Sequence, residues 1–217
     1  DAYDWNFDTS EMASAAASGL RVSNHSYGYT HGWIYAGVWY WFGDVTISTT
    51  EDYLFGFYDS TAEDYDQIAY NAPNYLIVKA AGNDRGEGPT AGTTHLVWQN
   101  GSWQWSTATR DKDGGASGYN TVADAAVAKN VLTIGAVNPI PSGYVSPSDV
   151  VMSTFSCYGP TDDGRIKPDV VADGVNVYSC IGTSDTAYDT YSGTSMASPN
   201  ASGAMGLILQ HIANVAS

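Results

Sequence analysis

Positively charged residues are scarce in this sequence. Its 217 residues include 8 Lys and Arg against 23 Asp and Glu, so the formal net charge at pH 7 is −15. Because contacts to phosphate need clustered cations, this balance argues against nucleic acid and against an anionic membrane surface as partners.

Long apolar runs and cysteines are also lacking. No segment approaches the roughly 18 apolar residues of a membrane-spanning helix, so no membrane span is predicted. The two cysteines, Cys157 and Cys180, do not have the spacing of metal ligands. Two alternatives remain open for them: a disulfide, which suits an extracellular setting, or two buried free thiols.

Apolar and aromatic residues are plentiful. Hydrophobic residues make up 43% of the chain, enough for the core of one domain, and aromatic residues make up 13%, with 16 Tyr and 7 Trp. A surface that is acidic and rich in Tyr, Trp, Asn, Gly and Ser favours a secreted or cell-surface protein.

Strand-like and helix-like segments alternate along the chain, which predicts an α/β fold with a parallel sheet. Helices are expected from Thr9, as N-cap, to Ser18 and, with a capping box at 60–63, from Ser60 to Tyr70. A short helical turn is expected within Val122–Lys129. The expected strands are Leu20–Ser23, Tyr75–Ala80, Val131–Ala136 and Val175–Cys180.

The segment Gly193–Pro199 (GTSMASP) carries the strongest functional signal, because it places Ser195 where a glycine turn feeds a helix. Free N–H groups and the positive end of the helix dipole favour negative charge there. Attack by a serine on a carbonyl creates such a charge on oxygen. Pro199 is expected in the first helical turn, where its missing N–H costs little.

These seven residues resemble the nucleophile motif of the subtilisin-like serine proteases, the subtilases. Three further segments match that family in the required order, and the resemblance spans about residues 7–212. They are Asn24–Gly28, similar to a strand along the substrate cleft, Ala80–Asp84, similar to the oxyanion-hole segment, and Phe155–Val170, similar to the approach to the last strands.

The resemblance implies a three-layer α/β fold with a parallel sheet. It also implies that residues 1–217 are the C-terminal portion of one catalytic domain, because neither an Asp-Thr/Ser-Gly motif nor a His-Gly-Thr motif precedes Asn24. Asp8-Thr9-Ser10 lacks the glycine, and His31-Gly32 falls after the cleft strand. We expect the triad Asp and His, with the N-terminal strands of the sheet, in a segment outside this chain.

The resemblance assigns a role to eight residues. Ser195 would be the nucleophile, and its N–H together with the side-chain amide of Asn83 would hold the oxyanion. The two walls of the pocket for the residue before the scissile bond would be Ser26, Tyr27 and Gly28 on one side and Ala80, Ala81 and Gly82 on the other. Glycine-lined walls suggest a large apolar substrate side chain.

Two stretches read as insertions into the family pattern, residues 29–58 and 86–119. The first is rich in aromatic residues, which could form a rim for a peptide substrate, although a hairpin that folds its aromatic face onto the domain is favoured. The second contains Asp111 and Asp113, candidate ligands of a structural calcium ion, with a solvated turn as the favoured alternative. No metal-ligand set is identified, and no cofactor is required.

The function expected from the resemblance is a secreted serine endopeptidase that acts on polypeptides. Because the triad Asp and His are expected elsewhere, this chain alone should be inactive. The alternative is a non-catalytic, subtilase-like binding or adhesion module. An esterase using His25 or His31 ranks far below, and His25, His31, His95 and His211 are expected to be structural or exposed.

Overall fold

The structure is a computed structural model of the chain and describes residues 6–216. At its centre is a parallel sheet of four strands in the order β1-β4-β7-β8. These strands are β1 (Val22–His25), β4 (Leu76–Ala80), β7 (Leu132–Val137) and β8 (Val170–Asp173). The helices are α1 (Asp8–Ala17), α2 (Ser60–Asn71) and α3 (Thr194–Val215), with two short 3-10 turns, η1 (Asp124–Val127) and η2 (Pro147–Asp149).

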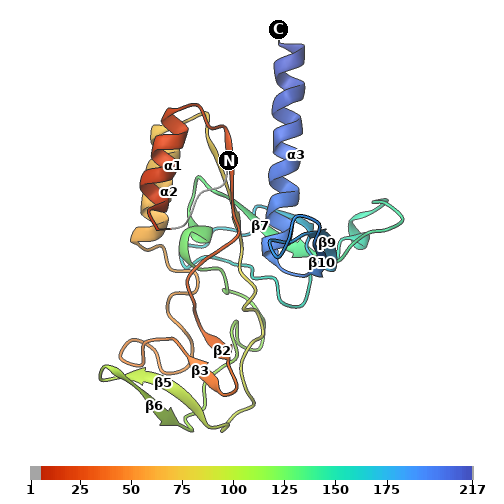
Figure 1. Ribbon diagram of the computed structural model, residues 1–217. Coiled ribbons are helices and arrows are strands. Elements are labelled where there is room, and N and C mark those ends of the chain that lie inside the picture. Colours follow the sequence, from red (N-terminus) through yellow and green to blue (C-terminus); the bar gives the residue numbers. More distant parts are fainter. Residues whose placement is uncertain (1–5, 217) are drawn as a thin grey trace.

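Alternate residues of β4 point to opposite faces of this sheet and belong to separate apolar clusters. Ile77 packs in a cluster with Met12 of α1 and Tyr65 of α2. Its neighbour Val78 packs in a second cluster with Ala197 of α3. Accordingly, α1 and α2 lie next to each other on one side of the molecule and α3 lies on the other (Figure 1). The predicted three-layer α/β fold with a parallel sheet is confirmed.

Both predicted N-caps are wrong. Helix α1 begins one residue before Thr9, and the residue that precedes it, Phe7, makes no side-chain cap. For α2, the capping box expected at 60–63 is replaced by Asp59, whose carboxylate accepts the N–H of Ala62 at 3.0 Å. Asp59 is as good a cap as serine, and the one-residue shift follows from where the chain leaves its extended conformation.

The strand expected at 175–180 does not join the central sheet. It forms β9 (Val177–Cys180), which pairs antiparallel with β10 (Tyr188–Tyr191) in a separate two-stranded sheet. The fourth central position belongs to β8. At Gly174 the chain turns beneath α3, where a Cβ atom would lie 2.7 Å from the carbonyl oxygen of Gly193. This close passage carries the chain out of the central sheet.

The two insertion-like stretches pair with each other. The first forms the hairpin of β2 (Trp33–Tyr35) and β3 (Trp39–Trp41), and the second forms β5 (His95–Gln99) and β6 (Ser102–Ser106). Strands β3 and β5 pair in parallel, giving one sheet in the order β2-β3-β5-β6. Trp33, Trp41 and Val97 are its buried core. The sequence did not predict this pairing, because it joins segments more than fifty residues apart.

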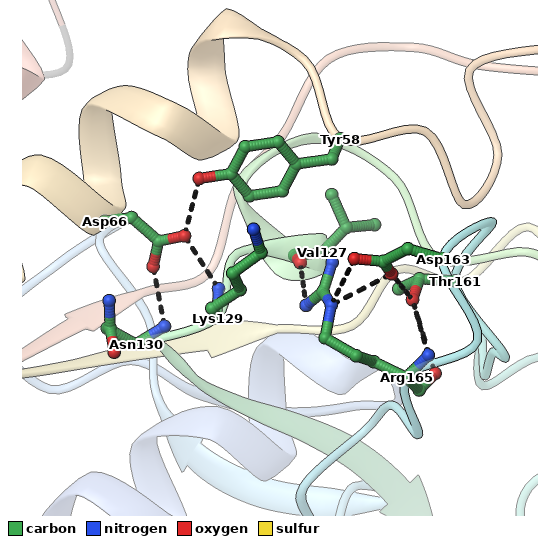
Figure 2. Close-up of polar contacts among 8 residues, drawn as sticks. All are labelled: Tyr58, Asp66, Val127, Lys129, Asn130, Thr161, Asp163 and Arg165. Atoms are coloured by element: carbon green, nitrogen blue, oxygen red, sulfur yellow. Dashed lines mark hydrogen bonds and ion pairs between the residues drawn. The ribbon is translucent and has the colours of Figure 1, made fainter.

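A buried carboxylate holds η1 against α2 (Figure 2). Asp66 accepts the hydroxyl of Tyr58 at 2.7 Å and the backbone N–H groups of Lys129 and Asn130 at 3.0 and 2.6 Å. In the same view, Arg165 donates to the carbonyl of Val127, the last residue of η1, at 2.6 Å. These contacts anchor the C-terminal end of η1, whose first residue lies at the candidate site.

The second half of α3 extends beyond the sheet, and its end is the most distant point from β5 and β6 in the view of Figure 1. Four large apolar side chains there are exposed: Leu207, Ile208, Ile212 and Val215. Among the described residues, nothing covers this face. Within the described part of the chain, no helix is long and apolar enough to cross a membrane.

Both cysteines are free thiols. Cys157 is buried beside Gly82 and Asp84, and Cys180 is exposed on β9. The disulfide alternative is therefore wrong in this structure, and only one of the two thiols is buried as the other alternative supposed.

Candidate active site

Ser195 is the second residue of α3 and lies where the helix starts. Its hydroxyl donates to the backbone carbonyl of Ser26 at 3.2 Å. Gly193 precedes the helix as N-cap. The amide of Ser195 belongs to the first helical turn, where N–H groups lack intrahelical acceptors and favour negative charge. The predicted helix-terminus setting of Ser195 is present.

Pro199 is not in the first helical turn as expected, because α3 already begins at Thr194. A residue at position 199 would normally donate its N–H to the carbonyl of Ser195, four residues earlier, and proline has no N–H to give. The hydroxyl of Ser26 donates to that carbonyl instead, at 2.9 Å. Ser26 and Ser195 are thus joined by two reciprocal hydrogen bonds, which hold the cleft strand against the start of α3.

Asn83 follows β4 and has its side-chain oxygen anchored. Its Oδ1 accepts the backbone N–H of Thr194 at 2.8 Å and the hydroxyl of Thr194 at 3.1 Å. Because the side-chain oxygen of Asn83 is held by Thr194, its NH₂ group remains available as a hydrogen-bond donor near the start of α3. A Cβ atom on Gly193 would lie 3.6 Å from that nitrogen. Asn83 and the amide of Ser195 are therefore two donors at one helix start, as an oxyanion hole requires.

Gly82 is required by its surroundings. Its φ is +106°, a conformation that side chains rarely adopt, and a Cβ atom would lie 3.1 Å from the sulfur of Cys157. Its N–H donates to the Thr194 hydroxyl at 3.1 Å. The same threonine therefore orients both Gly82 and Asn83.

A cavity of about 160 Å³ lies beside these groups. It is lined by seven of the eight residues that the resemblance singles out: Tyr27, Gly28, Ala80, Ala81, Gly82, Asn83 and Ser195. The eighth, Ser26, does not line it but holds Ser195 as described. The structure therefore brings all eight predicted site residues together.

The cavity also exposes residues that sequence reasoning missed. Four titratable side chains are part of its lining: His31, Lys79, Asp84 and Asp124. Asp84 ends the Ala80–Asp84 motif and Lys79 directly precedes it, whereas His31 and Asp124 come from other segments. These side chains give the cavity a polar lining, which does not support the expectation of a large apolar substrate side chain.

Two of these groups form a buried ion pair. His31 Nε2 donates to Asp124 at 2.9 Å, and its Nδ1 lies 4.0 Å from Asp52. Burial by itself lowers the pKa of His31, but the hydrogen bond and charge of Asp124 outweigh it and raise that pKa. Burial likewise opposes ionisation of Asp124, yet the contact with His31 holds its pKa below the usual value. Each group therefore favours the charged form of the other.

Lys79 lies nearly fully buried between the two pocket walls. Its ammonium donates to the backbone carbonyl of Tyr27 and lies 4.4 Å from the centre of the Tyr27 ring. Burial lowers its pKa to about 8. Lys79 thereby holds the backbone and the ring of Tyr27 in place.

Two buried histidines make contacts away from Ser195. His25 is bonded to Ser23 and Tyr27, and burial lowers its pKa to about 4. His95, the first residue of β5, is buried, and its Nδ1 lies 2.9 Å from the Thr93 carbonyl. In residues 6–216, no histidine is hydrogen-bonded to Ser195. The expectation that all four are structural or exposed holds, although His31 also lines the cavity.

Asp113, one of the two expected calcium ligands, does not lie in a solvated turn. This residue is buried rather than solvated, and its carboxylate accepts the N–H of Trp33 at 3.0 Å. Across residues 6–216, no three His, Cys, Asp or Glu side chains are grouped to hold a metal ion. Calcium binding by Asp111 and Asp113 stays a prediction.

Comparisons with known proteins agree with this geometry. The model of the subtilase family matches residues 5–217. Serine protease AprX of Bacillus subtilis is 36% identical over 102 residues, which are 42% of this chain and 23% of AprX. Pyrolysin of Pyrococcus furiosus is 37% identical over 110 residues, 42% of this chain and 8% of pyrolysin.

Two solved structures share the fold over 96% of the chain. The prenylagaramide maturation protease PagA superposes with a TM-score of 0.56 at 18% identity, and the patellamide maturation protease PatA with 0.55 at 17%. The chain covers 50% and 51% of those two chains, and less than a quarter of AprX and pyrolysin. The family match over nearly every residue, on this fold and around this helix-terminus serine, means that the chain belongs to the subtilase family.

Proposed function

We propose that this chain carries the nucleophile and the oxyanion hole of a secreted serine endopeptidase. The observation that carries the proposal is the anchoring of Asn83 through its oxygen to Thr194, which leaves its amide beside Ser195 at the start of α3. Ser195 would attack a peptide carbonyl, and the Asn83 amide with the Ser195 N–H would stabilise the oxyanion.

The base and its orienting carboxylate would come from a segment outside residues 1–217. Ser195 bonds to the carbonyl of Ser26, which cannot accept a proton at neutral pH. The chain also spans only about half the length of its solved structural relatives. The outer edge of β1 and the apolar end of α3 are the surfaces that such a segment would cover.

Substrate would bind as an extended strand along residues 26–28 and 80–82. Small residues at Gly28, Ala80 and Gly82 let a peptide backbone approach closely and pair with the chain. The cavity would take the side chain before the scissile bond. Its polar lining favours a side chain with a hydrogen-bonding end.

The test compares this chain with the same chain extended upstream by the coding sequence that precedes it. The extended protein should hydrolyse casein and react with a fluorophosphonate probe, and Ser195→Ala should abolish both. The present chain should be inactive in both assays, because serine without a base is a weak nucleophile. Robust activity of the short chain that depends on Ser195 would contradict the outside base.

A second function, a non-catalytic binding or adhesion module, draws on one observation: the hydroxyl of Ser195 is committed to the Ser26 carbonyl. If the extended protein is folded and binds peptides, yet neither cleaves them nor reacts with the probe, this second function is correct.

A further inference from the structure

One face of the small sheet carries exposed aromatic rings, none of which lines the cavity of the candidate active site. We call this surface the aromatic platform and define it as Tyr40, Phe42, Trp98, Trp103 and Trp105. Trp98 of β5 lies directly opposite Trp103 of β6. Leu96 of β5 lies opposite Tyr40 of β3 on one side and opposite Trp105 of β6 on the other. Side chains alternate along a strand, so these rings share the face opposite the buried Trp41 and Val97.

The rings of the platform support one another. The Trp103 centroid lies 5.0 Å from that of Tyr40, 5.1 Å from Phe42 and 5.4 Å from Trp98, each in an edge-on arrangement. Such contacts hold aromatic side chains in defined orientations. Even so, Trp98 is 50% exposed, Trp105 63% and Phe42 39%. Fixed rings that remain open to water on one face mark an interaction surface.

Charge is missing from this surface. No Asp, Glu, Lys or Arg occurs from Gly32 to Gly43 or from Gly88 to Thr109, the segments that contain all four strands. The polar residues Gln99, Ser102 and Gln104 lie on the other face of the sheet, the face of Val97, because Gln104 pairs with Val97 and Gln99 with Ser102.

This chemistry excludes two common occupants. An anionic membrane surface would need Lys or Arg beside the rings. Protein interfaces are enriched in arginine within an aromatic core, and the strands that carry the platform contain no arginine. A neutral polysaccharide matches the exposed rings, because the C–H faces of sugars stack on aromatic rings and need no charged partner.

We propose that the aromatic platform binds a neutral polysaccharide, independently of the peptide site. The test uses the full chain with three insoluble probes, namely microcrystalline cellulose, chitin and starch granules, and measures the bound fraction in a sedimentation assay. Binding to at least one of them is expected, with little effect of high salt, because the contacts carry no charge.

Trp98→Ala and Trp105→Ala should each weaken that binding by about tenfold, the effect of losing one stacked ring. Tyr70→Ala is the control, since Tyr70 is a more exposed ring, 78%, that lies on α2 outside the platform, and this variant should bind as wild type. Trp105→Tyr should restore part of the affinity. Circular dichroism verifies that each variant is folded.

Three results would overturn the proposal. These are no binding to any of the three probes, binding that Trp98→Ala and Trp105→Ala leave unchanged, and binding that high salt removes. Light scattering gives a further arm: self-association abolished by Trp105→Ala, without polysaccharide binding, would make the platform a contact between protein chains.

Discussion

At the scale of single residues, Thr194 holds the side-chain oxygen of Asn83, which leaves the side-chain NH₂ group available to donate to an oxyanion. In the proteolytically active, extended protein, Asn83→Leu should lower kcat by about 10²–10³ with little change in KM, a range established on a subtilisin. The amide meets full negative charge only in the tetrahedral intermediate, so its loss appears mainly in turnover. Steady-state kinetics on a chromogenic peptide measures the two constants.

Asn138→Leu serves as the control, because Asn138 is an exposed asparagine in the loop after β7. Both variants lose an amide and gain a leucine. If the two lose the same activity, or if the Asn83 variant changes KM alone, the oxyanion role of Asn83 is wrong.

Ser26 compensates for the proline in α3, and this contribution is measurable as stability. Ser26→Ala removes the donor to the Ser195 carbonyl, which Pro199 cannot replace. The free energy of unfolding should fall by about 1–2 kcal/mol in urea denaturation. Ser117→Ala, at an exposed loop serine, should leave it unchanged, and equal losses in both variants would contradict the role of Ser26.

The sequence identified Asn83 and Ser195 because each stands in a contiguous motif whose neighbours determine its setting. It could not identify His31, Lys79 and Asp124 as pocket residues. Their meeting depends on tertiary packing between an insertion, a central strand and η1, and no local pattern encodes that packing. The sequence also misplaced the start of α3, and with it the position of Pro199 in the helix. The start of a helix depends on tertiary contacts such as the hydrogen bond from the Thr194 N–H to Asn83.

At the scale of elements, the buried carboxylate of Asp66 adds hydrogen bonds to the apolar packing between α2 and η1. Asp66→Ala leaves two backbone N–H groups and the Tyr58 hydroxyl without their acceptor. The free energy of unfolding should fall by about 2–3 kcal/mol, as for hydrogen bonds to a charged group. Asp64→Ala is the control on the same helix, because Asp64 is exposed. Similar losses in the two variants would show that the network adds nothing.

Helix α3 should make the isolated chain prone to associate. Its exposed Leu207 and Ile212 would be covered in the extended protein, so Leu207→Lys with Ile212→Lys should reduce self-association of this chain in light scattering. The same double substitution in the extended protein should instead lower stability. A monomeric wild-type chain with little hydrophobic-dye binding would contradict this prediction.

Element types were predictable from hydrophobic pattern, whereas sheet membership was not. Strands β4 and β7 are mostly apolar and could be recognised as buried strands. The segment 175–180 is also expected as a strand, yet β9 is mostly exposed and pairs with β10 outside the central sheet, after the chain passes close to Gly193 at Gly174. Pairing partners are set by such long-range approaches, which a single segment does not reveal.

At the scale of the whole molecule, buried acid groups link stability to pH. Burial raises the pKa of Asp113 to about 9, from an ordinary value of 3.8, and the carboxylates of Asp84, Glu87 and Asp52 add to the rise. Above the ordinary value the unfolded chain loses this proton while the folded chain keeps it. Stability from this group is therefore complete at low pH and is lost as pH rises towards 9.

Asp113→Asn should flatten that dependence between about pH 5 and pH 9, because the amide oxygen still accepts the Trp33 N–H and no longer titrates. Urea denaturation at several pH values measures the slope. Asp111→Asn, at the exposed neighbouring position, should keep the wild-type slope. An unchanged slope for Asp113→Asn would show that other groups dominate.

The parallel pairing of β3 with β5 also has an evolutionary consequence. This pairing joins the two ends of the chain segment that contains α2, β4 and Asn83. The buried core of the small sheet takes Trp33 and Trp41 from the first insertion and Val97 from the second. Loss of either insertion would expose the apolar side of the one that remained. The two are therefore expected to behave as a single heritable unit, in which loss of one insertion disfavours retention of the other, although they are separate in the sequence.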